Sequence, residues 1–305
     1  MSKEIIKLIG ATKDYIWGGN KLRAYGKKSD SDRIAESWEL SFHKDGESRT
    51  ESGALLSDGV TAADLGEAVA KHRDFPVLVK LIDAADNLSV QVHPTDEYAL
   101  KNEGGYGKTE AWYIMDADDG AGIYLGFKRA VTRDELIKAV SDGSVLDLLR
   151  FHKVKRGDSF LIPAGTVHAI GKGVTLCEAQ ENSNLTYRVY DYKRRDKFGN
   201  ERPLHLSKAL KVLDFSEYGG EKEARFGRNG RIFIETESFS ACISEILESG
   251  VIEVGARSFV SVTVTDGNGF IGDKEAFVGD TLFIPAGYGE VKCRGKMTLV
   301  VVEVI

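Results

Sequence analysis

The chain has 305 residues, of which 42% are hydrophobic and 29% are charged, and its formal net charge at pH 7 is −6. This size and composition are typical of a globular protein with one large domain or two ordinary ones. The acidic balance excludes a general attraction to nucleic acid or to anionic membranes, so an anionic ligand would need a local basic cluster.

The N-terminal stretch SKEIIKLIGATKDY lacks the apolar core of a signal peptide, because Lys and Glu interrupt it. The most apolar run, MTLVVVEVI at 297–305, is too short to span a bilayer. The cysteines Cys177, Cys242 and Cys293 form no CxxC pair, so they predict inert, buried thiols rather than a disulfide framework or a cysteine zinc site. We therefore expect a cytoplasmic protein with no membrane or nucleic-acid partner.

Short segments rich in Val, Ile, Phe and Thr, separated by Gly and Asp-Gly, predict a mainly β fold. The clearest expected strands lie at 36–43, 75–82, 109–115, 159–163, 257–265, 280–286 and 297–305. Helical patterns interrupt them at 61–72, 132–140, 144–150 and 205–215. Thr61 with Asp64, and Thr132 with Glu135, have the spacing of capping boxes. Helices that cover barrel ends account for these patterns.

The stretch SVQVHPTDEY at 89–98 reads as a strand that runs into a turn. Because side chains alternate along a strand, Val90 and Val92 should face one side and Gln91 and His93 the other. Two inward residues at i and i+2 can supply neighbouring ligands of a metal site inside a barrel. Gln91 and His93 are therefore the first two ligand candidates.

The other two candidates are Glu110, in the stretch GKTEAWY, and His168. Lys108 should share a strand face with Glu110. Two imidazoles, one carboxylate and one amide oxygen suit a divalent cation, with Zn²⁺ as the first choice. The remaining histidines are expected to be ordinary surface or core residues: His43, His72, His152 and His205.

An internal repeat supports His168. GDSFLIPAG at 157–165 and GDTLFIPAG at 279–287 share Gly-Asp at the start and Ile-Pro-Ala-Gly at the end, 122 positions apart. Two turn–strand–turn copies predict two related β-barrels. Five residues after the proline the first copy has His168 and the second has Glu290, so we expect that only the first barrel carries a metal.

A basic stretch, YRVYDYKRRDKFGNERP, occupies 187–203. Lys193 to Lys197 read as a solvated loop. Arg188 lies in the alternating stretch LTYRVY, so it should belong to a strand and point into the barrel. An inward arginine in an acidic protein needs an anion such as a phosphate or an enediolate.

Six motifs occur in order along the first two thirds of the chain: YIWGG, ESWELS, QVHP, GKTEAWY, PAGTVHAI and ENSNLTYR. Together they resemble type I mannose-6-phosphate isomerase in its short bacterial form, over most of residues 10–215. The loop after Arg188 also follows the short-form pattern. Residues 225–305 resemble the second, metal-free cupin barrel of that family.

The resemblance implies a mainly β, double jelly-roll (bicupin) fold with a small helical insertion around 130–150. It implies a catalytic cupin domain at 1–215, with N-terminal strands, and a metal-free cupin-like domain at 216–305. It also implies one Zn²⁺ per chain, with ligands that map onto Gln91, His93, Glu110 and His168. The active-site arginine of the family maps onto Arg188, its lysine onto Lys108, and an acidic residue that lines the pocket onto Glu178.

The implied activity is the interconversion of mannose 6-phosphate and fructose 6-phosphate through a cis-enediol. Such a reaction needs a general base and a fixed cation beside the developing charge. Glu178 is our candidate base, Lys108 a candidate for proton relay or ring opening, and Arg188 a candidate to stabilise the enediolate or to bind phosphate. Two alternatives stay open, a cupin non-haem metal oxygenase and a non-catalytic sugar-binding cupin. The sequence assigns no oligomeric state.

Overall fold

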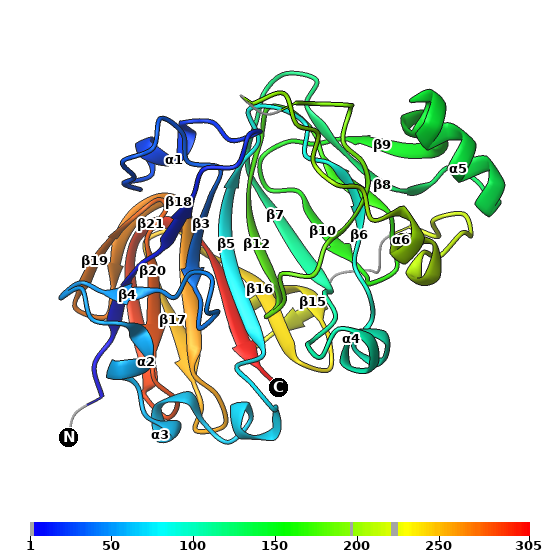
Figure 1. Cartoon of the computed structure of the whole chain (residues 1–305). Helices are drawn as coiled ribbons and strands as arrows, with labels where there is room; N and C mark the ends of the chain where they lie inside the picture. Colours follow the sequence, from blue (N-terminus) through cyan, green and yellow to red (C-terminus); the bar gives the residue numbers. More distant parts are fainter. Residues whose placement is uncertain (1–2, 196–197, 221–224) are drawn as a thin grey trace.

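The computed structural model describes residues 3–195, 198–220 and 225–305, and the strands in these residues form three antiparallel sheets (Figure 1). Lys197, at the end of the expected solvated loop, lies outside the described residues. The first sheet runs in the order β10 (Ser159–Ile162), β7 (Glu110–Ala117), β12 (Val174–Glu181), β5 (Val77–Asp83), β3 (Glu36–Leu40) and β2 (Ala11–Lys13). The second sheet runs in the order β13 (Tyr187–Tyr190), β6 (Val90–Val92), β11 (His168–Ile170), β8 (Gly122–Phe127) and β9 (Leu149–Lys153).

The third sheet contains most of the C-terminal part of the chain. Its main path is β14 (Arg225–Gly227), β15 (Gly230–Glu235), β16 (Phe239–Ile246), β21 (Gly289–Val304), β18 (Val260–Ile271), β20 (Thr281–Ile284), β1 (Ile6–Ile9) and β4 (Arg49–Thr50). β17 (Ser249–Val254) pairs with β21, and β19 (Lys274–Phe277) pairs with β18. The N-terminal strand β1 therefore pairs with a strand of the C-terminal part, whereas β2 pairs with β3 in the first sheet.

The first and second sheets pack face to face and enclose one apolar core. Trp112 and Leu176 come from the first sheet, and Ile123 and Ile170 from the second. These residues alternate along their strands with residues that face the other way, as period-2 patterning requires. We call this two-sheet unit the first barrel.

The third sheet curls around a second apolar core, which contains Ile252, Val262, Leu282 and Val291. We call this unit the second barrel. The outer face of the third sheet packs on the outer face of the first sheet, with residues such as Phe283 against Leu40 and its neighbours in a third core. The mainly β architecture of two barrels expected from the sequence is confirmed.

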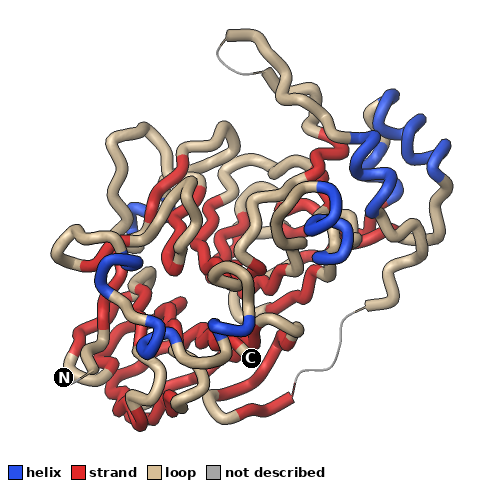
Figure 2. The backbone as a smooth tube through the Cα atoms, turned by 60° about the horizontal axis from the view of Figure 1, so that its bottom comes forward, coloured by secondary structure: helices blue, strands red, loops and turns tan. Residues whose placement is uncertain are grey.

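Helices cover the outer face of the second sheet (Figures 1 and 2). α5 (Arg133–Asp142) and α6 (Leu206–Val212) place Leu136 and Ala209 on the buried side chains of β6, β11 and β13. The other helices are short: α1 (Lys21–Ala24), α2 (Leu56–Gly59), α3 (Ala62–Leu65), α4 (Asp96–Asn102) and the 3₁₀ turns η1 (Val69–Lys71) and η2 (Val145–Leu148). In the described part of the chain, no helix has the length and apolarity needed to cross a membrane.

Local sequence signals explain where several helices begin and end. Both expected capping boxes, at Thr61 and Thr132, are present. The helix expected at 61–72 is broken, because Gly66 adopts φ +89° and separates α3 from η1. The helix expected at 144–150 was wrong in its second half, since Leu149 begins strand β9, which pairs with β8.

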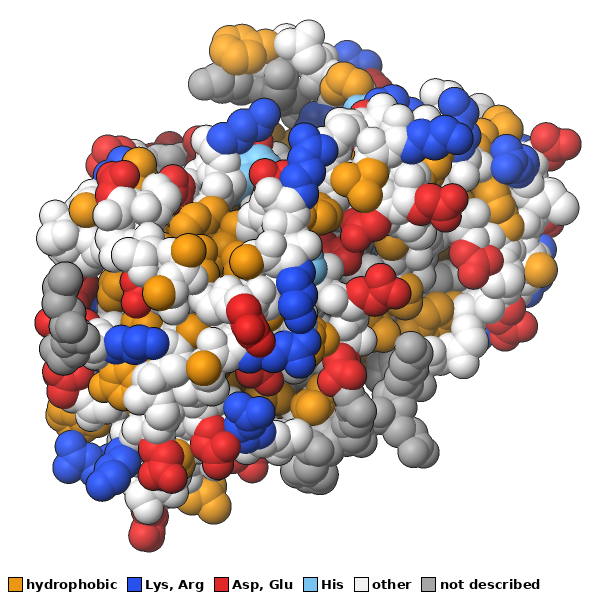
Figure 3. Space-filling view, turned by 90° about the horizontal axis from the view of Figure 1, so that it is seen from below, with side chains coloured by type: hydrophobic (Ala, Val, Ile, Leu, Met, Phe, Trp, Pro, Cys, Tyr) orange, Lys and Arg blue, Asp and Glu red, His pale blue; other side chains and the backbone are white. Residues whose placement is uncertain are grey.

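The expectation of free, buried thiols is confirmed. All three cysteines are buried and free, and burial raises the pKa of Cys293 to about 11. On the face shown in Figure 3, acidic and basic side chains are interspersed, without a large field of one sign.

Candidate active site

Three buried side chains from separate elements converge inside the first barrel. Glu110 begins β7, His168 begins β11, and His93 follows β6. Each offers one ligand atom, and these atoms lie within 4.8 Å of one another. The side chains are 0 to 1% exposed. In the described parts of the chain, this is the one group of three or more His, Cys, Asp or Glu residues with the geometry of a metal site.

Backbone carbonyls hold both imidazoles in the orientation that a metal ligand needs. His93 Nδ1 donates to the carbonyl of Leu185 at 2.7 Å, and His168 Nδ1 donates to the carbonyl of Thr166 at 2.9 Å. Because a carbonyl accepts only, each Nδ1 carries the proton and each Nε2 keeps its lone pair. The two Nε2 atoms lie 3.2 and 3.6 Å from the carboxylate oxygens of Glu110.

The electrostatics of the site keep both rings neutral. Burial, reinforced by the nearby cation of Lys108, lowers the pKa of His93 to about 3. Burial also lowers the pKa of His168. Burial alone would raise the pKa of Glu110, but the adjacent cation of Lys108 outweighs burial and holds that pKa well below its ordinary value, so Glu110 keeps its charge. Neutral imidazoles beside a carboxylate are the form that binds a divalent metal.

Gln91 is the residue opposite His168 in the pairing of β6 with β11. Its amide Nε2 lies 3.3 Å from His168 Nε2, on the side of the ring that faces Glu110. Glu110 Oε2 is buried and has no hydrogen-bond partner among the described residues. An unsatisfied buried carboxylate oxygen beside two imidazole lone pairs fits a bound cation, which would satisfy all of them.

Lys108 lies against this group. Its side chain is buried, its Nζ contacts Glu110 Oε1, and it lies 3.5 Å from His93 Nε2. The segment before β7 is fixed from behind, because the backbone N–H of Thr109 donates to the carboxylate of Glu181 at 2.7 Å.

A buried ladder of charges crosses the first sheet beside the histidines. Lys80 on β5 pairs in register with Glu178 on β12, and their charged atoms are 3.3 Å apart. Lys80 also lies 3.7 Å from the carboxylate of Glu36 on β3. The indole of Trp112 donates to Glu178 at 2.8 Å, and the indole of Trp38 donates to Glu36 at 2.6 Å. Every charge in the ladder therefore has a partner.

Burial and neighbouring charges shift the pKa values of both Glu178 and Lys80. Burial raises the pKa of Glu178, and the charge of Glu110 raises it further. Burial alone would lower the pKa of Lys80, but the carboxylates of Glu36 and Glu178 outweigh burial and raise it. Lys80 is therefore a permanent cation between two carboxylates.

These groups open onto one cavity of about 280 Å³. Arg188 reaches it from β13, where it pairs in register with Gln91. Its lining residues are Tyr15, Trp17, Glu36, Lys80, Ile82, Leu88, Ser89, Gln91, Lys108, Ile170, Glu178, Asn184, Thr186, Arg188 and Arg202. The structure thus brings all seven residues singled out from the sequence to this cavity or directly behind it.

Sequence reasoning missed Lys80 and Glu36. Both lie in segments that were correctly expected to be strands, ESWELS and FPVLVKLI. The available signal was a single charge inside an apolar strand, since Lys80 is only 4% exposed. A buried lysine requires charge partners, which are often functional.

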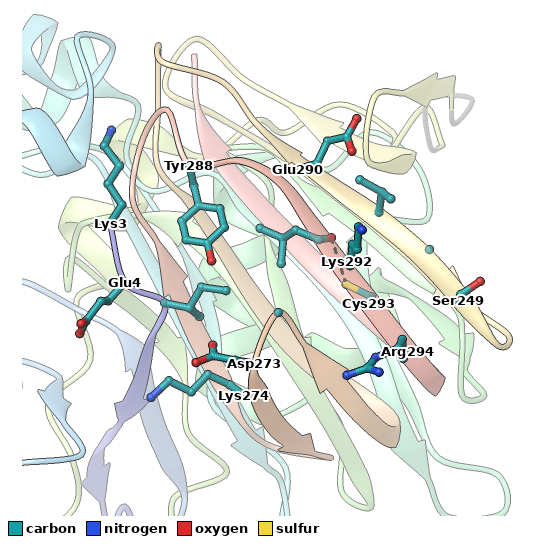
Figure 4. Close-up of a pocket in the computed structure, with 15 residues that line it drawn as sticks. Lys3, Glu4, Ser249, Asp273, Lys274, Tyr288, Glu290, Lys292, Cys293 and Arg294 are labelled. Carbon is teal, nitrogen blue, oxygen red and sulfur yellow. Dashed lines mark hydrogen bonds between the residues drawn. The ribbon is translucent and has the colours of Figure 1, made fainter. Parts of the chain in front are cut away.

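A larger cavity, of about 980 Å³, lies at the second barrel (Figure 4). Its labelled residues come from the N-terminal segment, from the starts of β17 and β19, and from β21 and the turn before it: Lys3, Glu4, Ser249, Asp273, Lys274, Tyr288, Glu290, Lys292, Cys293 and Arg294. Glu290, the counterpart of His168 in the repeat, is exposed here, whereas the next residue, Val291, is buried in the second core. The repeat therefore does not place a ligand inside the second barrel at this point.

Comparison with known proteins agrees with this geometry. Residues 5–119 match the family described as phosphomannose isomerase type I, catalytic domain. The chain is 37% identical over 307 residues to mannose-6-phosphate isomerase ManA of Bacillus subtilis, with 95% of each protein covered. It is 43% identical over 208 residues to mannose-6-phosphate isomerase of Streptococcus mutans, covering 65% of this chain and 64% of that protein.

Comparison of the fold with solved structures finds the same family. The crystal structure of mannose 6-phosphate isomerase from Bacillus subtilis superposes with a TM-score of 0.87 at 33% sequence identity, covering 98% of this chain and 99% of the other. The similarity therefore extends over both barrels and includes the part of the chain that holds the buried His, Glu and His. By sequence, fold and site together, the chain belongs to the type I phosphomannose isomerase family.

Proposed function

We propose that this chain interconverts mannose 6-phosphate and fructose 6-phosphate with one Zn²⁺ bound inside the first barrel. The observation that carries the proposal is the arrangement of His93, Glu110 and His168, in which both imidazoles turn an unprotonated Nε2 toward one carboxylate. Family membership and the names of the full-length relatives support the reaction.

The donor set fits zinc. His93, His168 and Glu110 would hold the ion, and Gln91 would be the fourth ligand. For this the Gln91 amide must be turned so that Oε1 rather than Nε2 faces the ion; the oxygen and nitrogen of an amide are told apart only by their hydrogen bonds. When bound there, the ion supplies a fixed positive charge close to the sugar oxygens on which negative charge develops.

Glu178 is the proposed base for proton transfer between C1 and C2. Its raised pKa brings the carboxyl group closer to neutral pH, where it can both accept and return a proton. The indole of Trp112 and the ammonium of Lys80 fix its orientation. Glu178 lines the same cavity as Gln91, Lys108 and Arg188.

The proposed reaction gives Glu178, Lys108 and Arg188 one role each. In the aldose-to-ketose direction Glu178 accepts the proton from C2, and the electron pair of that C–H bond forms the C1–C2 double bond of a cis-enediol. The ammonium of Lys108 gives a proton to the oxygen on C1. The proton on Glu178 then returns to C1, while the hydroxyl on C2 gives its proton to the amine of Lys108 and becomes the ketone, so that both groups regain their starting protonation states. Arg188 stabilises the negative charge on these oxygens.

The test is a coupled assay that follows fructose 6-phosphate formation from mannose 6-phosphate, before and after treatment with a chelator and again after Zn²⁺ is restored. We expect activity to disappear with the metal and to return with it. A protein that stays fully active when its metal content is far below one ion per chain would overturn the metal assignment. A metal-loaded protein without turnover would overturn the proposed reaction.

His168→Ala tests the ligand set. We expect loss of bound zinc and a fall in turnover of at least about 100-fold, since even groups that only support a metal ligand contribute roughly 10- to 100-fold. Metal analysis and the same assay measure both effects. His72→Ala, at a partly exposed histidine after η1, is the matched control and should keep metal and rate. Stoichiometric zinc in His168→Ala would remove this residue from the ligand set.

A further inference from the structure

Two arginines meet at one end of the catalytic cavity, although they lie on different segments. Arg188 belongs to β13, and Arg202 belongs to the loop that leads into α6; both line the cavity. Arg188 Nη1 donates to the carbonyl of Pro203 at 2.9 Å. The backbones are also joined, because His205 N donates to Arg188 O at 2.7 Å. The position of Arg202 relative to Arg188 is therefore fixed by the fold.

The carboxylates near these arginines do not balance their charge. Asp191 accepts from Arg202 Nε at 2.8 Å and from Arg194 Nη2 at 2.6 Å, so two guanidinium groups share one buried carboxylate. The second partner of Arg194, Asp86, is about half exposed. Arg188 forms no ion pair with any described residue, and its Nε is buried without a hydrogen-bond partner among them. Burial and then repulsion by Arg202 lower the pKa of Arg188.

The fold holds three guanidinium groups around a single buried carboxylate, Asp191, and a bound anion would stabilise this excess of positive charge. A phosphate monoester matches this need, since arginine forks bind its oxygens in pairs. Neutral donors lie on the same wall, because Thr186 and Asn184 also line the cavity. Glu36 and Glu178 line another part of the wall and would repel a phosphate.

We propose that Arg202 is a specificity-determining residue that binds the phosphate group of the sugar phosphate, while Arg188, between Arg202 and Gln91, faces the reacting end of the same molecule. Asp191 orients the Arg202 fork. This assignment rests on the proposed function and extends it, because it fixes the direction in which the substrate lies: phosphate at the arginines, C1 and C2 toward Glu178 and the ligand set.

Arg202→Ala and Arg202→Lys test the assignment, with Arg194→Ala as the matched control. Arg194 shares Asp191 with Arg202 but does not line the cavity, so its loss disturbs the same carboxylate and leaves the proposed phosphate contact intact. Steady-state kinetics with mannose 6-phosphate give kcat and KM, and metal analysis checks that zinc stays bound.

For Arg202→Ala we expect KM to rise roughly 10- to 100-fold with little change in kcat, as for a lost hydrogen bond to a charged group. Arg202→Lys should show a smaller rise, because it keeps the charge and loses the fork. Arg188→Ala should instead lower kcat by about 100-fold, as for loss of a transition-state charge contact. An unchanged KM in Arg202→Ala, or an equal rise in Arg194→Ala, would overturn the assignment.

Calorimetric titration with inorganic phosphate separates this proposal from the proposed reaction, since it needs no turnover. We expect the metal-loaded wild-type protein and Arg194→Ala to bind phosphate, and Arg202→Ala to bind it at least about 10-fold more weakly. If the wild type binds phosphate through Arg202 but does not isomerise the sugar, only the proposed reaction fails. If the wild type isomerises and Arg202→Ala binds phosphate normally, only the phosphate assignment fails.

Discussion

Glu181 connects the segment that carries Lys108 to the rest of the molecule. Its carboxylate accepts from the N–H of Thr109, and the side chain is only 8% exposed. Burial, with a further contribution from Asp96, raises its pKa from the ordinary 4.5 to about 7, and the hydrogen bonds from Thr109 and Ser238 offset only part of this. The group therefore gains a charge at neutral pH in a position where charge is poorly solvated.

This shift predicts a pH dependence of stability. In the unfolded chain Glu181 ionises near pH 4.5, whereas in the folded chain it ionises near 7. The folded state binds more protons between these values, so the free energy of unfolding should fall as pH rises through that window. Glu181→Gln should abolish this loss, which we expect to be about 1 to 3 kcal/mol.

Urea unfolding at several pH values between 4 and 9 measures the effect. The glutamine variant should gain stability relative to the wild type as the pH increases through the window set by the two pKa values, about 4.5 and 7. Glu67→Gln, at an exposed carboxylate, is the control, and its free energy of unfolding should change with pH as that of the wild type does. Parallel curves for Glu181→Gln and wild type would contradict the prediction.

Among the elements, α5 is the one whose ends are best defined by local chemistry. Thr132 accepts from the N–H of Glu135, Glu135 accepts in return from the N–H of Thr132, and Gly143 ends the helix with φ +88°. The helix packs on the outer face of the second sheet, and no residue of α5 lines the catalytic cavity. Its stability should therefore be separable from activity.

Thr132→Ala removes one half of the capping box. We expect the free energy of unfolding to fall by about 1 kcal/mol, while kcat and KM stay unchanged. Thr132→Ser keeps the hydroxyl and should behave like the wild type. Denaturant unfolding and the isomerase assay measure the two readouts, and a large change in KM would mean that α5 is coupled to the cavity.

Local signals identified this helix in the sequence, whereas other elements needed tertiary information. Seven residues after Pro94 and Thr95 form α4, where the sequence suggested only a turn. Such a short helix has little periodicity to detect, and it begins because Thr95 accepts from the N–H of Tyr98. The first two residues of β9 were read as the end of a helix, because they close the apolar run SVLDLLR and the pairing of β9 with β8 is non-local.

The site residues also divide into those that local sequence signals predict and those that depend on tertiary structure. Strand alternation and the repeat indicated His93, Glu110 and His168, and the structure places their ligand atoms together. Lys80 and Glu36 could not be connected with Glu178 from the sequence, because their contact depends on the register of β3, β5 and β12. Register in a sheet is set by long-range pairing rather than by any one segment.

At the scale of the whole molecule, the two barrels share an apolar core. Aromatic rings form a continuous stack across it: Phe283 lies 5.0 Å from Phe259, Phe259 lies 5.4 Å from Phe75, and Phe75 lies 4.1 Å from Phe42. Phe283 lies in β20 and Phe259 directly precedes β18, both in the third sheet's part of the chain, whereas Phe75 and Phe42 flank strands of the first sheet. If the two barrels separated, or if one unfolded alone, this apolar surface would be exposed to water.

We therefore expect a single cooperative thermal transition rather than one for each barrel. Phe283→Ala should lower the free energy of unfolding by about 3 to 5 kcal/mol, as for deletion of a fully buried aromatic ring. Phe283→Leu should cost less, since most of the buried volume is kept. Differential scanning calorimetry measures both, and two well-separated transitions in the wild type would contradict a shared core.

The pairing of β1 with β20 joins the first strand of the described chain to one of the last. During translation β1 leaves the ribosome long before β20 has been made, and its hydrogen-bonding edge stays uncovered in the meantime. Closure of the second barrel must then wait until β20 has emerged. In that interval the nascent chain presents an open strand edge to solvent.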